Sequence, residues 1–328
     1  MEHTIMDFFR VSFSVSGVES LVFVPPLVAF VISFFTSMGG ISGAFLLLPF
    51  QMSFLGYTNP SVSATNQLFN IVAIPSGVYR YYKEGRMVWP LTWAVIIGTL
   101  PGVFIGAIVR VAYLPDPKSF KLFAALVLLY IGGRMVRDLL AKPQSGADNS
   151  SVEQRFRELA CRHRNEPENS DCPEPLPGVK VTRFDLKRIG YDFYGEHCEA
   201  PTWGIFTLSF GVGIVGGIYG IGGGAIIAPF FVSFFGLPVY TVAGAALMGT
   251  FVTSVAGVGF YQAIAPLYPN MSVAPDWFLG FLFGIGGMAG MYLGARFQKF
   301  VPAKAIKWML AAVIVFTAAK YVLSFFGL

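Results

Sequence analysis

The chain has 328 residues, of which 55% are hydrophobic and only 12% charged, with a mean hydropathy of +0.63. Soluble domains carry about 25% charged residues, so a soluble protein of this length is excluded, because it could not cover its surface. Of the 23 basic and 18 acidic side chains, nine and eleven lie in residues 141–200. The composition therefore predicts a polytopic membrane protein with one polar insert.

The net charge of +5 does not indicate a nucleic-acid partner, because the basic residues outside the insert are spread over short loops. The three cysteines all lie inside the insert and do not form a disulfide framework. Three acidic residues and one basic residue occupy the first twenty positions, the reverse of a cleavable signal peptide.

Ten apolar stretches approach the length of about 20 residues that a membrane-spanning helix needs. Five precede the insert, at 20–38, 40–56, 61–82, 88–110 and 119–140. Five follow it, at 203–219, 221–236, 239–264, 277–296 and 304–326. We therefore predict an all-α polytopic membrane protein with a transmembrane repeat at 1–140, a polar cytoplasmic insert at 141–202 and a second transmembrane repeat at 203–328.

The two halves are related by an internal duplication. A shift of 180 residues aligns 40–81 with 220–261 without a gap, and thirteen of these 42 positions are identical. A shift of 188 then matches the Gly-x₃-Gly-x₃-Gly run at 98–106 to the run at 286–294. Five segments per repeat is an odd number, so the second repeat should be inverted. Four spans per repeat, with each short pair as one broken span, would instead give a parallel duplication.

Charges in the loops give a predicted orientation. The loop with Arg80, Lys83 and Arg86 and the loop at 296–307 are basic, which places both, with the insert, in the cytoplasm. The loop at 110–121 is also basic and disagrees with this orientation. We expect the charges near helix ends to snorkel to the interface; these are Arg80, Arg110, Arg134 and Lys320.

Glycine-rich junctions join the first two segments of each repeat. Their members are Gly40 and Gly43 in the first repeat and Gly220, Gly222, Gly223 and Gly224 in the second. Paired, Gly-interrupted short segments are the best sequence indication of a transporter site. The helix that follows each junction presents unpaired N–H groups and the positive end of its dipole, which favours an anion. The alternative is that the glycines only permit close helix crossing.

Polar residues follow the first junction along 61–82. Ser63, Asn66, Gln67 and Asn70 are spaced to share one helical face, which should look into the bundle or a wet cavity. Thr250 and Thr253 follow the second junction. We expect the amides and both threonines to hold the substrate with the junction glycines, or alternatively to form hydrogen bonds between helices.

No Asp or Glu lies inside any apolar segment, which argues against a cation substrate. No catalytic constellation is present, so we expect neither an enzyme nor a cofactor. A metal site is not supported either, because the candidate ligands lack metal-binding spacing; they are Cys161, His163, Cys172, His197 and Cys198. The glycine runs at 98–106 and 286–294 should pack helices closely, within the chain or at the seam of a homodimer.

The insert has two parts. Residues 141–178 have the composition of a linker, with a short helix at Val152–Arg162. Residues 179–197 alternate polar and apolar side chains, which predicts a small β-hairpin.

The segment Gly217-Ile-Tyr-Gly-Ile-Gly-Gly-Gly-Ala-Ile-Ile-Ala-Pro-Phe, with 237–258 after it, resembles the TauE/SafE family of sulfite exporters. The first repeat, from Gly39 through Pro49 to Asn66, is similar to the same duplicated unit, although Ser42 and Ala44 stand where the second copy has glycine. The resemblance implies a permease for small sulfur-containing anions, such as sulfite or sulfonates, in a prokaryotic inner membrane.

These observations favour a secondary transporter in the lipid bilayer that moves a small anion by alternating access. One alternative is an anion channel of the same architecture. Another is a membrane-anchored sensor in which the polar insert carries the function.

Overall fold

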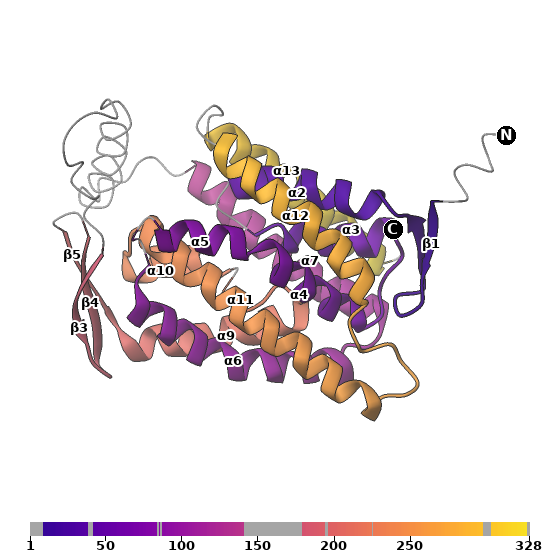
Figure 1. The fold of residues 1–328 in the computed structure, drawn as a ribbon, viewed down its shortest axis with the longest axis horizontal. Coiled ribbons are helices and arrows are strands. Elements are labelled where there is room, and N and C mark those ends of the chain that lie inside the picture. The colour runs from indigo at the N-terminus through magenta and orange to yellow at the C-terminus, as the bar shows by residue number, and fades with distance from the viewer. Residues whose placement is uncertain are drawn as a thin grey trace.

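Helices lie side by side in an elongated bundle, with a small sheet at one end and a hairpin at the other (Figure 1). This computed structural model describes residues 9–38, 42–83, 85, 87–140, 179–193, 196–224, 226–297 and 303–326. Four helices within these ranges are long and apolar enough to cross a membrane: Trp89–Ala112, Thr202–Tyr219, Thr241–Leu267 and Trp277–Gly294. The predicted helical membrane architecture with a small sheet-containing insert is therefore confirmed.

The first half opens with a hairpin that the sequence analysis did not predict. Strands β1 (Arg10–Phe13) and β2 (Val18–Leu21) pair antiparallel, so the first helix begins at Val24 instead of residue 20. The helices that follow are α2 (Val24–Met38), α3 (Ala44–Phe54), α4 (Ser61–Ala73), α5 (Pro75–Lys83), α6 (Trp89–Ala112) and α7 (Pro117–Leu140).

The second half repeats this order. Its elements are α9 (Thr202–Tyr219), α10 (Ile227–Phe235), α11 (Val239–Ile264) with the short 3-10 turn η1 (Ala265–Leu267), α12 (Trp277–Phe297) and α13 (Ala303–Phe326). The single segment predicted at 61–82 is divided into α4 and α5, whereas its counterpart α11 is continuous. The break falls at Ile74 because Pro75 has no N–H to donate to the helix.

The two glycine runs are buried in contacts within the chain. A Cβ on each glycine of the run in α6 would press on a backbone carbonyl of α9. The three carbonyls, in order along the run, are those of Phe206, Phe210 and Ile214. The matching run in α12 meets the carbonyls of Pro26, Phe30 and Phe34 in α2. The two sets of carbonyls are related by the 180-residue shift and the two glycine runs by the 188-residue shift. Each repeat thus packs its fourth helix against the first helix of the other repeat.

Helices α4 and α11 cross at the centre of the bundle. Gln67 of α4 lies against Gly257 of α11, and Leu247 of α11 lies against Gly77, at the start of α5. The 180-residue shift converts the first of these pairs into the second. From Gln67 to Gly77 the residue number rises, whereas that of the α11 partner falls from Gly257 to Leu247. The two helices therefore run in opposite directions.

The described part of the insert is a three-stranded antiparallel sheet made of β3 (Lys180–Phe184), β4 (Arg188–Phe193) and β5 (Glu196–Pro201). The predicted hairpin corresponds to β3 and β4, and β5 adds a strand that leads directly into α9. Tyr191 is buried and its hydroxyl lies 2.8 Å from Oγ1 of Thr241 in α11. The predicted linker at 141–178 and its helix lie outside the described residues.

The glycine contacts generate a prediction about stability. Gly102→Ala should lower the free energy of unfolding by about 1–3 kcal/mol, because the new Cβ would overpack against α9. Gly133→Ala in α7 is the matched control, since a Cβ there meets nothing within 4 Å and alanine favours a helix by up to about 1 kcal/mol. Thermal unfolding of the purified protein in detergent measures both. Equal changes for the two variants would contradict the packing interpretation.

Candidate functional site

Asn70 connects the two glycine junctions. Its Oδ1 accepts a hydrogen bond from Oγ of Ser42 at 3.2 Å, next to the first junction, and its Nδ2 donates to the carbonyl of Ile221 at 2.9 Å, inside the second. All three residues are buried. Gly40 lies outside the described residues, and Gly43 forms the turn that directly precedes α3. The structure therefore brings the described parts of both junctions to one side chain.

The second junction needs glycine for backbone conformation and for close approach. Gly220 ends α9 with φ +81°, and Gly222 has φ +74°, both in the left-handed region. A Cβ on Gly223 would overlap the side chain of Thr99, and one on Gly224 would strike the carbonyl of Ala246. Atoms of α6 and α11 occupy the space that side chains at Gly223 and Gly224 would need, so these glycines allow the helices to approach closely.

Three of the four polar residues on α4 satisfy backbone carbonyls at the ends of broken helices. Ser63 donates to the carbonyl of Ile218 at 2.9 Å, Asn66 to that of Ala44 at 2.9 Å, and Asn70 to Ile221. All four side chains, Gln67 included, are fully buried, as predicted for a face that looks into the bundle. These hydrogen bonds place the polar face of α4 against both junctions.

Gln67 differs from its neighbours, because neither Oε1 nor Nε2 of its carboxamide has a hydrogen-bond partner. A buried amide without a partner costs roughly 1–3 kcal/mol. The equivalent position in the second repeat is occupied by Leu247, which carries no such cost. The unpaired carboxamide is therefore a specific departure from the internal symmetry, at the place where α4 crosses α11.

Thr250 and Thr253 lie on α11 beside the second junction. Their hydroxyls donate to carbonyls of their own helix, at 2.8 Å to Ala246 and 2.7 Å to Gly249. Oγ1 of Thr253 also accepts a hydrogen bond from the N–H of Gly223 at 3.2 Å. Thr253 therefore positions an N–H group of the junction itself.

Tyr219 is a junction residue that the sequence analysis missed. Pro49 cannot donate to the carbonyl four residues before it, that of Phe45, and the Tyr219 hydroxyl donates to this carbonyl at 2.9 Å. A proline inside an apolar helix signals that such a carbonyl needs a donor. The donor here comes from the other repeat, which the local sequence does not reveal.

The prediction that Arg110 snorkels to the membrane interface is wrong. Its side chain is fully buried in the last turn of α6. The guanidinium donates to the carbonyl of Leu114 and, at 2.8 Å, to that of Thr58, and lies 3.6 Å from the ring centroid of Phe120. The guanidinium therefore bonds to groups inside the fold, whereas the side chain was expected to extend to the membrane interface.

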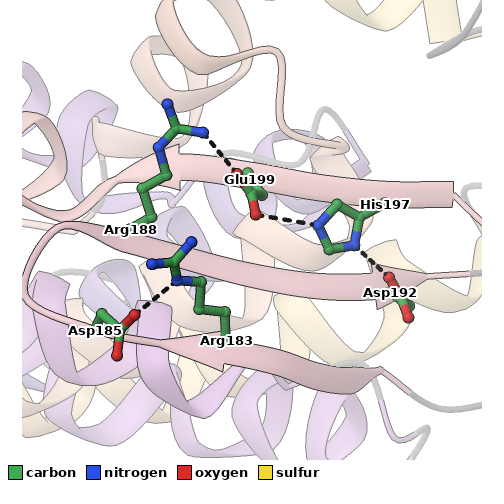
Figure 2. A network of polar contacts seen from close by, with 6 residues as sticks. All are labelled: Arg183, Asp185, Arg188, Asp192, His197 and Glu199. Atoms are coloured by element: carbon green, nitrogen blue, oxygen red, sulfur yellow. Dashed lines mark hydrogen bonds and ion pairs between the residues drawn. The ribbon is translucent and has the colours of Figure 1, made fainter.

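On the insert sheet, His197 lies between two carboxylates (Figure 2). Its Nδ1 is 2.6 Å from Oδ1 of Asp192 and its Nε2 is 3.3 Å from Oε1 of Glu199, which also pairs with Arg188 at 2.9 Å. Across the described ranges, no group of three His, Cys, Asp or Glu side chains is arranged to hold a metal ion. Cys161, His163 and Cys172 lie outside those ranges.

Residues 26–321 match the family described as sulfite exporter TauE/SafE, which confirms the resemblance inferred from the glycine motifs. Comparisons with curated proteins and with solved structures gave no match.

The connecting role of Asn70 predicts a loss of stability on substitution. Asn70→Ala should lower the free energy of unfolding by about 1–3 kcal/mol for each buried group that loses its bond to Asn70, namely the Ile221 carbonyl and the donor hydrogen of the Ser42 hydroxyl. Ser254→Ala is the control, because its hydroxyl makes only a 3.5 Å contact with Asn70. Thermal unfolding measures both, and a smaller loss for Asn70→Ala than for Ser254→Ala would refute this role.

The sheet network predicts a pH dependence. The hydrogen bonds to Asp192 and then to Glu199 raise the pKa of His197 above its ordinary value of about 6.5. A raised pKa in the folded state stabilises the sheet fully below that ordinary value, and the contribution disappears as pH rises through the folded value. Histidine-selective NMR titration should give a midpoint above 6.5 for His197 that falls in Asp192→Asn. A midpoint at or below 6.5 in the unmodified chain would contradict the network.

Proposed function

The chain belongs to the TauE/SafE family of sulfite exporters, and from this we propose that it is a secondary transporter for small sulfur-containing anions in the inner membrane of a prokaryote. The family is a transporter family, and the four long apolar helices are those of an integral membrane protein. Sulfite and organosulfonates present several oxygen acceptors, which suit N–H donors held inside an apolar bundle.

We propose that the two halves form an inverted repeat. Helices α4 and α11, the third segments of the two halves, run in opposite directions, as Gln67 on Gly257 and Leu247 on Gly77 indicate. Each fourth helix packs against the first helix of the other half at equivalent residues. This exchange supports a pseudo-two-fold relation, which transporters of this kind use to alternate access between the two sides.

The proposed anion site lies between the junctions. Helices α3 and α10 begin there, and the first N–H groups of a helix have no partner within it. Asn66, Gln67 and Asn70 contribute carboxamides from α4. Thr250 and Thr253 line the second junction from α11, where Thr253 positions the N–H of Gly223. These groups, with the junction glycines, would hold an anion through backbone and amide donors without a cationic side chain.

The observation that carries this proposal is the unpaired carboxamide of Gln67. Asn66 and Asn70 already bond to backbone carbonyls, so their donors are partly used. Gln67 retains two free donors on Nε2 and one acceptor on Oε1. A buried group of this kind is costly in an apo protein and becomes favourable when a ligand oxygen accepts its hydrogen bonds.

The assay is uptake of radiolabelled sulfite into sealed vesicles that contain the purified protein. Gln67→Leu, which installs the residue of the second repeat, should reduce the transport rate by at least about tenfold, the loss expected for one hydrogen bond to a charged ligand. The same variant should unfold at an equal or higher temperature, because it removes an unsatisfied polar group.

Saturation and counterflow of labelled sulfite would identify a carrier instead of a channel, whose flux would follow only the potential. The control is Leu323→Gln on α13, where the side chain is 49% exposed, and it should leave the rate unchanged. Transport at the wild-type rate by Gln67→Leu would show that the anion binds elsewhere. No uptake of any sulfur oxyanion by the wild-type protein would refute the proposed substrate class.

A further inference from the structure

Arg110 is a buried cation without an acidic partner in the described part of the chain. No Asp or Glu among the described residues pairs with it, and the ion pairs of Arg183, Arg188 and His197 lie in the insert sheet. The buried carboxylate of Asp276 is used at another place, where it accepts hydrogen bonds from the N–H groups of Ser16 and Leu279, each at 3.1 Å. The positive charge of Arg110 is therefore not cancelled by a neighbouring side chain.

The groups around the guanidinium compensate it only in part. The carbonyls of Leu114 and Thr58 and the ring of Phe120 offer partial negative charge. The Nε atom has no hydrogen-bond partner although the residue is fully buried. Burying an ion costs several kcal/mol when its charge is not matched. A bound anion would lower this cost, because it would supply the missing negative charge and an acceptor for Nε.

The position of Arg110 links it to the second junction. Tyr261 packs with Ala107 and Val111, which lie on either side of Arg110 along α6. The Tyr261 hydroxyl donates to the carbonyl of Gly217 at 3.1 Å, in the last turn of α9 before Gly220. Tyr261 therefore connects the stretch of α6 around Arg110 with the last turn of α9, three residues before Gly220.

Arg110 also lies at the end of the bundle away from the insert. The backbone N–H of Val179, just before β3, bonds to the carbonyl of Gly85 at 3.1 Å, so α6 begins beside the sheet. Arg110 is in the last turn of the same 24-residue helix. In Figure 1 the sheet is at one end of the bundle and the β1 hairpin is at the other.

We infer that Arg110 forms a second anion-binding site, for a small oxyanion, on the route between the central site and the membrane face opposite the insert. The inference rests on the proposed function. A fixed positive charge in low-dielectric surroundings attracts anions and raises their local concentration. The central site binds through neutral donors, so this guanidinium supplies the electrostatic attraction that those donors lack.

The test separates charge from structure with two substitutions. Arg110→Lys keeps the charge but loses the fork that bonds to Leu114 and Thr58, whereas Arg110→Gln loses both. Both variants should therefore unfold at lower temperatures than the wild type. In oriented vesicles, Arg110→Gln should raise the half-saturating sulfite concentration roughly tenfold from the face opposite the insert, while Arg110→Lys stays within about twofold of the wild type.

Equal increases for the two variants, or equal increases from both membrane faces, would overturn the inference and leave Arg110 as a structural residue. A second measurement keeps this result separate from failure of the central site. In the Gln67→Leu background, sulfite should still raise the unfolding temperature, and Arg110→Gln should abolish that shift. No shift in Gln67→Leu would overturn the second site, whereas absence of transport by the wild type would refute the proposed function.

Discussion

Two interrupted helices inside an apolar bundle leave backbone carbonyl and N–H groups that lipid cannot satisfy, and the centre of this protein is built around that requirement. Asn70 bonds to both junctions, Ser63 and Asn66 bond to carbonyls at helix ends, and Tyr219 supplies the donor that Pro49 lacks. Because most of these hydrogen bonds join one half of the chain to the other, the broken helices hold the two halves together at the level where the proposed substrate binds.

The two halves are nearly equivalent in backbone packing and different in polarity. Gly102 meets Phe210 in the same way that Gly290 meets Phe30, so the glycine ridges follow the duplication residue by residue. The polar residues of α4 are not repeated, however. The 180-residue shift aligns Asn66, Gln67 and Asn70 with Ala246, Leu247 and Thr250. In the proposed transporter, two units of similar packing would move against each other, while the carboxamides proposed to face the anion come from the first of them.

Periodicity and duplication were sufficient to predict helices in both halves and the burial of the α4 face, and the glycine-rich motif carried the resemblance to the family. Other features depend on contacts between distant residues and leave no local signal. The β1 hairpin is too short to be recognised, and Ser16 and Asp276 meet across 260 residues. The prediction for Arg110 was wrong because a charge near a helix end is usually solvated. Here the guanidinium instead bonds to the carbonyl of Thr58 and lies over the ring of Phe120. The spacing on α4 gave four polar residues but could not separate the three that are paired from Gln67.

The exchange of helices between the halves has a consequence for biogenesis. The surface of α2 around Pro26, Phe30 and Phe34 is covered by residues 286–294 of α12, about 260 positions later in the chain. At a synthesis rate of about 5–20 residues per second, α2 waits roughly 13–50 seconds in the membrane before its partner is made. Over that interval this surface of α2 lacks the glycine run of α12 that covers it in the folded protein. The first half therefore cannot complete its own packing until α12 has been made, in the last third of the chain.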